Sequence, residues 1–95
     1  MMTDREIGQF MDTFRIGIKK PAEDWLMRYD KEIQRRFAVK IRKLKEYPES
    51  HGKPLRGALH GYWEIYFENR FRIIYTINHE KNLVMIEAIK HKDEF

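Results

Sequence analysis

The sequence has no cysteine, so it offers neither a disulfide framework nor a thiolate metal site. It also has no apolar run of the length that a bilayer-spanning helix needs. Its first six residues, Met-Met-Thr-Asp-Arg-Glu, are too polar for the start of a secretory signal peptide. These absences favour a cytoplasmic protein that makes no contact with membranes.

The usual sequence signals of metal and cofactor sites are missing as well. His51, His60 and His79 lie in predicted loops and lack the spacing of metal ligands. No glycine-rich phosphate loop and no Ser/His/Asp arrangement is recognisable. We therefore predict neither a metal nor another cofactor.

Charge is what the sequence has in abundance. Its 95 residues, enough for one domain, are 36% charged and carry a net charge of +4. The segment between Lys31 and Arg56 holds nine basic residues against three acidic ones, a net charge above that of the whole chain. Such a surface attracts nucleic acid or an acidic protein, although a solvated helix face explains it equally well.

The first half of the chain has mainly helical patterns. Thr3-Asp4-Arg5-Glu6 resembles a capping box and predicts a short helix in residues 1–13, an extension to a domain of residues 14–95. The segment Phe14–Lys19 alternates as a short strand does, although Phe14 and Ile18 also fit a continuing helix.

A longer amphipathic segment follows. From Pro21 to Glu46 apolar residues recur in steps of three and four, which indicates one buried helical stripe. Asp30 is a good N-cap and divides this segment into two helices, about 22–29 and 31–46. Tyr47-Pro48 ends the second helix. We expect the two helices to form a hairpin.

The second half predicts strands. Residues 49–61 read as a loop, and strands are expected at about 62–67, 71–77 and 83–90. Glu68-Asn69-Arg70 is short enough to be a hairpin turn. The predicted fold class is α+β, a helical hairpin packed on one face of a small, mainly antiparallel four-stranded sheet.

An arginine stands in the middle of the second strand. Phe71, Ile73 and Tyr75 alternate with it and are the natural contacts of the helices, so Arg72 faces the uncovered side or pairs with Glu64 or Glu87 across the sheet. The last strand brings His91 to its end, followed by Lys92. An arginine, a histidine, a lysine and aromatic rings on one open surface would suit RNA, because they provide phosphate contacts, proton transfer and base stacking.

From about Phe14 to Phe95 the sequence resembles the RelE/ParE toxin superfamily of type II toxin–antitoxin systems. The resemblance rests on five short motifs in order: Leu44-Lys45-Glu46-Tyr47-Pro48, Pro54-Leu55-Arg56-Gly57, Tyr62-Trp63-Glu64-Ile65, the strand Phe71–Ile77, and the ending His91–Phe95. It implies an mRNA endonuclease that acts on translated mRNA at the ribosome, uses the RNA 2′-hydroxyl as nucleophile, and is neutralised by an acidic antitoxin.

The resemblance also implies roles for single residues. Arg72 matches the strand arginine that holds the scissile phosphate in RelE. The ending His91–Phe95 looks like that of the YafQ-like branch, in which the histidine serves in acid–base chemistry and the aromatic ring helps to place the substrate. Lys92 would stabilise developing charge. Weaker RNA-binding candidates are Arg70 and Tyr66 on the hairpin and Arg56 in the preceding loop.

Two alternatives remain open. Trp63 and Ile65 stand where RelE has a pair of lysines, which leaves Glu64 and His91 as candidate general bases. A ParE-like inhibitor of DNA gyrase without nuclease activity, or an inactive relative that only binds an antitoxin, would have no need of those lysines.

Overall fold

A computed structural model describes residues 13–93 of the chain. The predicted N-terminal helix in residues 1–13 lies outside these residues, apart from Thr13. None of the helices in the described part is long and apolar enough to cross a membrane.

Two helices form the predicted hairpin. Helix α2 spans Lys20–Met27 with Pro21 in its first turn, and α3 spans Lys31–Arg42. The Asp30 side chain caps α3, because its Oδ1 accepts a hydrogen bond of 3.0 Å from the Ile33 amide. The chain then tightens into a 3₁₀ turn, η1 (Lys43–Lys45), so the helical region ends close to the predicted residue 46.

The sheet has five strands, not the four predicted. They are β1 (Arg15–Ile18), β2 (Lys53–Pro54), β3 (Trp63–Phe67), β4 (Phe71–Asn78) and β5 (Leu83–His91). Their order is β1-β5-β4-β3-β2, and every pair is antiparallel except β1 with β5. Phe14–Lys19 is therefore a strand and not a continuing helix.

The segment predicted as a loop contains the additional elements. Tyr47 adopts a left-handed backbone with φ 52°, and Pro48 then begins the single-turn helix α4 (Pro48–His51). Strand β2 pairs Lys53 with Glu64, and the 3₁₀ turn η2 (Gly57–Leu59) leads into β3. A two-residue strand that ends in proline has neither the length nor the alternation that would reveal it in the sequence.

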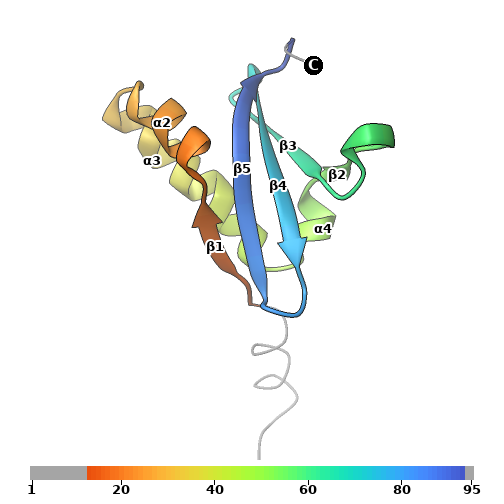
Figure 1. The fold of residues 1–95 in the computed structure, drawn as a ribbon. Helices are drawn as coiled ribbons and strands as arrows, with labels where there is room; N and C mark the ends of the chain where they lie inside the picture. Colours follow the sequence, from red (N-terminus) through yellow and green to blue (C-terminus); the bar gives the residue numbers. More distant parts are fainter. Residues whose placement is uncertain (1–12, 94–95) are drawn as a thin grey trace, which may run out of the picture.

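The helices cover one face of the sheet, and α3 crosses behind β4 and β5 in Figure 1. The core lies between these layers. Its members that are less than 2% exposed include Phe37 and Leu44 from the helical side and Ile73, Tyr75, Val84 and Ile86 from the strands. The alternation of β4 is thus confirmed, because Phe71, Ile73 and Tyr75 all face the helices.

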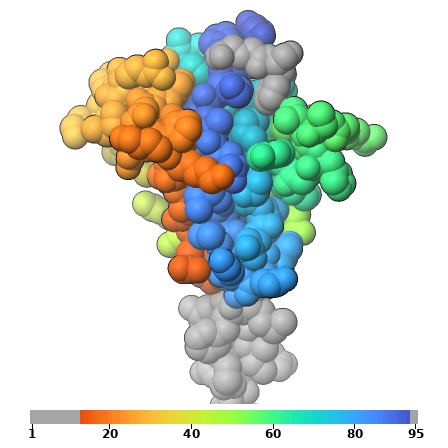
Figure 2. All heavy atoms as spheres, in the orientation of Figure 1, coloured from red at the N-terminus to blue at the C-terminus, as the bar shows by residue number. Residues whose placement is uncertain are grey.

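The other face of β4 and β5 is open. Figure 2 shows these two strands exposed between α2 on one side and the segment around β2 and η2 on the other. The β3–β4 hairpin closes through Glu68 and Asn69, whose φ angles of 55° and 58° are those of a type I′ turn. The Arg70 amide donates to the Phe67 carbonyl across this turn.

Candidate functional site

A cavity of about 470 Å³ lies on the open face at the hairpin end of the sheet. It is lined by Tyr66 from β3, Asn69 from the turn, Arg72 from β4, and Lys92 and Asp93 just after β5. The hairpin register places Tyr66 directly opposite Arg72. The cavity therefore gathers two cations, a phenol ring, an amide and a carboxylate from parts of the chain that the sheet brings together.

Arg72 is held by two contacts within the sheet. Its Nε lies 3.4 Å from Glu64 Oε1, and its Cζ lies 5.8 Å from the centre of the Tyr66 ring. The Arg72 and Glu64 side chains are 23% and 12% exposed. The pairing left open by the sequence is therefore with Glu64, and Arg72 nevertheless lines the cavity.

Lys92 is fixed beside the hairpin by its backbone. Its amide donates a 2.8 Å hydrogen bond to the Arg70 carbonyl, which continues the pairing of β4 and β5 by one residue. The Lys92 side chain remains exposed and lines the cavity with Arg72. Two positive groups can therefore approach one anionic ligand there.

His91 lies on the opposite face of the sheet. It pairs with Phe71, and the two rings meet edge to face with their centres 5.9 Å apart. Phe71 packs against Trp25 and Tyr29 on the helical side. The structure thus does not bring His91 into the cavity lining with Arg72.

A β-bulge in β5 causes this arrangement. Ile74 pairs with Ala88 whereas Tyr75 pairs with Ile86, so Glu87 is an additional residue. Simple alternation from Val84 and Ile86 would place Ile89 and His91 on the open face. The bulge inverts that pattern, and the residues of β5 beyond it that face the open side are Ala88, the partner of Ile74, and Lys90, the partner of Arg72.

His91 still has a link to the cavity through Asp93. Its Nδ1 lies 3.5 Å from Asp93 Oδ2 and accepts a hydrogen bond of 3.4 Å from the Asp93 amide. Asp93 itself lines the cavity. Nothing in the sequence signalled that Asp93 and Asn69 would line the cavity. Asp93 follows the last predicted strand, and Asn69 is a common turn residue.

The remaining predicted residues lie around the cavity or apart from it. Arg70 is exposed, and its guanidinium lies 4.9 Å from the centre of the Phe71 ring. Arg56 is exposed just before η2 and does not line the cavity. Phe95 lies outside the described residues. Trp63 packs against the core, and Ile65 belongs to it, so neither position provides a cation on the open face.

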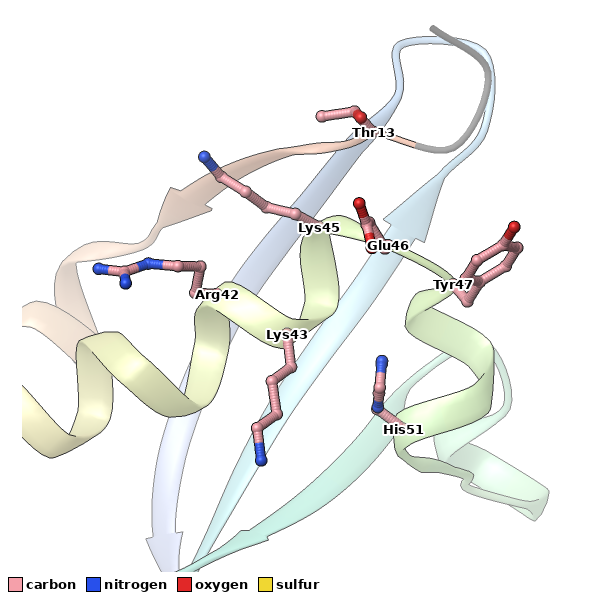
Figure 3. Close-up of a pocket in the computed structure, with 7 residues that line it drawn as sticks. All are labelled: Thr13, Arg42, Lys43, Lys45, Glu46, Tyr47 and His51. Atoms are coloured by element: carbon pink, nitrogen blue, oxygen red, sulfur yellow. The ribbon is translucent and has the colours of Figure 1, made fainter. Parts of the chain in front are cut away.

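A larger cavity, of about 560 Å³, lies at the far end of the helical layer (Figure 3). Arg42, Lys43 and Lys45 line it together with Thr13, Glu46, Tyr47 and His51. Figure 3 shows the three cationic side chains pointing in different directions. They do not converge on one anion, so the Arg72 cavity is the better candidate site.

Part of the basic segment is neutralised within the structure. Glu32 forms ion pairs with Arg35 and Arg36, and Arg36 also contacts Glu68 Oε1 at 3.0 Å. The hydrogen bond from Arg35 and the charges of both arginines lower the pKa of Glu32. These arginines therefore belong to a solvated, ion-paired helix face.

Residues 24–94 match one family, described as phage derived protein Gp49-like (DUF891). The chain belongs to this Gp49-like family. No curated protein sequence matches the chain at a significant level.

The Gp49-like chain is similar in structure to RelE-type proteins. The RelBE2 toxin–antitoxin complex from Mycobacterium tuberculosis matches with a TM-score of 0.74 and 24% identity, over 88% of this chain and 97% of that one. The RelE–RelB complex from Pyrococcus horikoshii gives 0.67 and 22%, over 87% and 99%. The YoeB/ParE toxin from Agrobacterium tumefaciens gives 0.70 and 18%, over 82% and 98%. The Gp49-like chain thus has the RelE/ParE toxin fold, which confirms the expected fold family.

Proposed function

We propose that the chain is the toxin of a type II toxin–antitoxin pair, and that it is an endoribonuclease which cuts translated mRNA at the ribosome. The observation that carries this proposal is the open-face cavity in which Arg72, Lys92 and Tyr66 meet. A phosphate and a neighbouring base are the chemistry that two cations and a ring accept best. The fold, which matches proteins named as toxins, supports the same function.

The reaction needs little from the protein. The 2′-hydroxyl oxygen of the RNA bonds to the adjacent phosphorus, and the bond from phosphorus to the 5′-oxygen of the next nucleotide breaks. The hydroxyl proton leaves to a base, and the departing oxygen takes up a proton from an acid. Arg72 and Lys92 would stabilise the additional negative charge on the phosphoryl oxygens, and Tyr66 would stack on a base beside the cleaved bond.

The proposal assigns the proton transfer to His91. Its support is the 3.5 Å contact with Asp93, which joins the ring to the cavity lining. The strand register, however, turns the His91 ring toward Phe71 and away from the cavity. Glu64 is therefore the rival candidate for the base, because the Glu64 carboxylate lies beside Arg72 on the open face. Comparing His91→Ala with Glu64→Gln decides between these two bases.

The proposed partner is a small acidic antitoxin. Two of the similar structures, RelBE2 from Mycobacterium tuberculosis and RelBE from E. coli, are named as toxin–antitoxin complexes. The chain carries a net positive charge, so an acidic partner would be attracted to it and would mask the cavity. A neighbouring gene for such a protein should restore growth when it is expressed together with this chain.

Purified ribosomes that are translating a defined mRNA provide the test. Wild-type protein should cut the mRNA, Arg72→Gln should not, and Lys81→Gln, an exposed cation in the β4–β5 turn, should cut as wild type does. Intact mRNA with folded wild-type protein would rule out the nuclease.

A second candidate is a ParE-like inhibitor of DNA gyrase. Two observations favour it. Trp63 and Ile65 pack at the core and provide no second pair of cations, and His91 is not among the described residues that line the cavity. This candidate predicts inhibited supercoiling by purified gyrase with mRNA intact. A protein that binds the antitoxin but neither inhibits gyrase nor cuts mRNA would be an inactive relative.

A further inference from the structure

A second cleft lies at the edge of β5, next to the Arg72 cavity. Strand β1 pairs with β5 only from Leu83 to Ile86, so α2 and not a strand flanks the described remainder of that edge. Figure 1 shows β1 beside the lower half of β5 and α2 beside its upper half. A cleft of about 550 Å³ lies there, lined by Trp25, Arg28, Tyr29, Ile89 and Lys90.

The aromatic rings in this cleft are held in place by packing. Trp25 lies in α2 and Tyr29 lies two residues beyond the end of this helix, and their ring centres are 4.4 Å apart. Phe71 contacts both rings edge to face, at 4.8 Å and 5.8 Å. Both cleft rings are nevertheless partly exposed. The two rings lie against each other and form a preorganised platform, so a flat ligand could stack on its outer ring face without ordering new side chains.

The charges of the cleft are positive. Arg28 is the exposed C-cap residue of α2, and Lys90 projects from β5. None of the residues that line the cleft within the described range 13–93 is acidic. Rings together with cations and no carboxylate are the features of surfaces that bind single-stranded nucleic acid.

The sheet register joins the cleft to the candidate site. Lys90 lines the cleft and pairs directly with Arg72, which lines the neighbouring cavity. Residues paired in this way have their side chains about 5 Å apart on the same face. Cations and rings therefore continue from Tyr66 and Arg72 on the open face, around the edge of β5, to Arg28 and Trp25 at the C-terminal end of α2.

We propose that the cleft between α2 and β5 binds the single-stranded RNA next to the phosphate held by Arg72. A base stacks on the Trp25–Tyr29 platform, and Arg28 and Lys90 neutralise neighbouring phosphates. This inference rests on the proposed function and deepens it, because it assigns a second subsite to the RNA. A peptide strand paired with the β5 edge is the other occupant of such a cleft, but it would not need two cations beside two exposed rings.

Binding is measured with a fluorescein-labelled 2′-O-methyl oligoribonucleotide of about ten nucleotides. This probe lacks the free 2′-hydroxyl, so binding is recorded whether or not the protein cleaves RNA. The titration is repeated from about 50 mM to about 400 mM salt. Wild type, Arg28→Gln, Lys90→Gln and the matched control Lys81→Gln are compared after circular dichroism has shown that each is folded.

Arg28→Gln and Lys90→Gln should each bind more weakly and reduce the logarithmic salt slope by about 0.7, the contribution of one phosphate contact on a single strand. Lys81→Gln should leave affinity and slope unchanged. In a Trp63→Phe background, in which Trp25 is the one remaining tryptophan, the probe should quench the fluorescence. Salt slopes equal to that of the control, or unquenched Trp25, would overturn the subsite.

The outcomes also separate this inference from the proposed function. Probe binding that depends on Arg28, with mRNA never cut, would retain the subsite and reject the nuclease. Cleavage that requires Arg72, with cleavage and probe binding both unaffected by Arg28→Gln and Lys90→Gln, would retain the nuclease and reject the subsite. A cleft that binds an acidic antitoxin peptide through Arg28 and leaves the RNA probe unaffected would overturn the subsite in favour of a protein partner.

Discussion

Replacing Arg72 with glutamine should have two separable effects, one on stability and one on RNA cleavage. The side chain touches Glu64, whose carboxylate is 12% exposed, and it lines the cavity. Arg72→Gln removes the positive charge 3.4 Å from Glu64 Oε1. A largely buried carboxylate then loses its cation, and this costs about 1–3 kcal/mol of unfolding free energy.

The loss should be visible in thermal unfolding. A domain of this size loses about 4–8 °C in Tm for each kcal/mol. Adding Glu64→Gln removes the carboxylate that Arg72→Gln leaves without its cation. The double variant should therefore lose less unfolding free energy than the sum of the two single losses, by about 0.5–3 kcal/mol. A matched control is Lys81→Gln, which removes an exposed cation and should leave Tm unchanged.

Cleavage should follow a different pattern. If Arg72 acts on the phosphate and Glu64→Gln alone still cleaves RNA, the double variant Glu64→Gln/Arg72→Gln stays inactive although its stability recovers in part. Cleavage that returns together with Tm would refute this reasoning, because Arg72 would then have mattered only for folding. Loss of cleavage in folded Glu64→Gln, with cleavage retained in His91→Ala, would favour Glu64 over His91 as the base.

Three further predictions concern the scaffold. Tyr75→Phe removes the 2.8 Å hydrogen bond from the buried phenol to the Pro48 carbonyl and should cost about 1–3 kcal/mol in urea unfolding. Burial raises the pKa of Tyr75 above its ordinary value of 10.0. The free energy of unfolding of the wild type should therefore be unchanged up to about pH 10 and fall above it, more steeply than that of Tyr75→Phe. Parallel pH profiles of the two proteins would show that Tyr75 does not cause the fall. Gly52→Ala should cost about 1–3 kcal/mol or prevent folding, because its Cβ would meet the Tyr75 hydroxyl and lie 2.6 Å from the Glu64 carbonyl oxygen; an unchanged Tm would contradict that packing. Asp30→Ala removes the cap of α3 and should cost about 1 kcal/mol in the same urea assay, whereas no change would mean that the Ile33 amide is satisfied by water.

Much of the fold could be predicted from local patterns. Steps of three and four residues located α2 and α3, the Asp30 cap divided them, and alternation around Arg72 gave β4 its buried and open faces. These signals are strong because each reports burial along a single element. The short strand β2 had no such signal, since its two residues are held by pairing with β3.

The candidate site was less predictable for a different reason. Arg72 could be placed on the open face because it alternates with Phe71, Ile73 and Tyr75, which all belong to the core. Which face of the sheet His91 and Lys92 occupy depends on the additional residue of the bulge, Glu87. The Glu87 carboxylate lies 2.7 Å from Lys19 Nζ and accepts a hydrogen bond of 2.8 Å from the Thr76 hydroxyl. A bulge stabilised by contacts between distant segments cannot be read from the alternation of one strand.

Mapping new RNA 5′ ends in cells after induction shows directly whether the protein cuts mRNA and whether the cuts depend on Arg72. Wild type and Lys81→Gln should produce the same cuts within translated codons and arrest translation. Folded Arg72→Gln should produce none, and His91→Ala should lose them as well if His91 transfers the proton. Identical cuts with wild type and Arg72→Gln, or no cuts with folded wild type, would contradict the account.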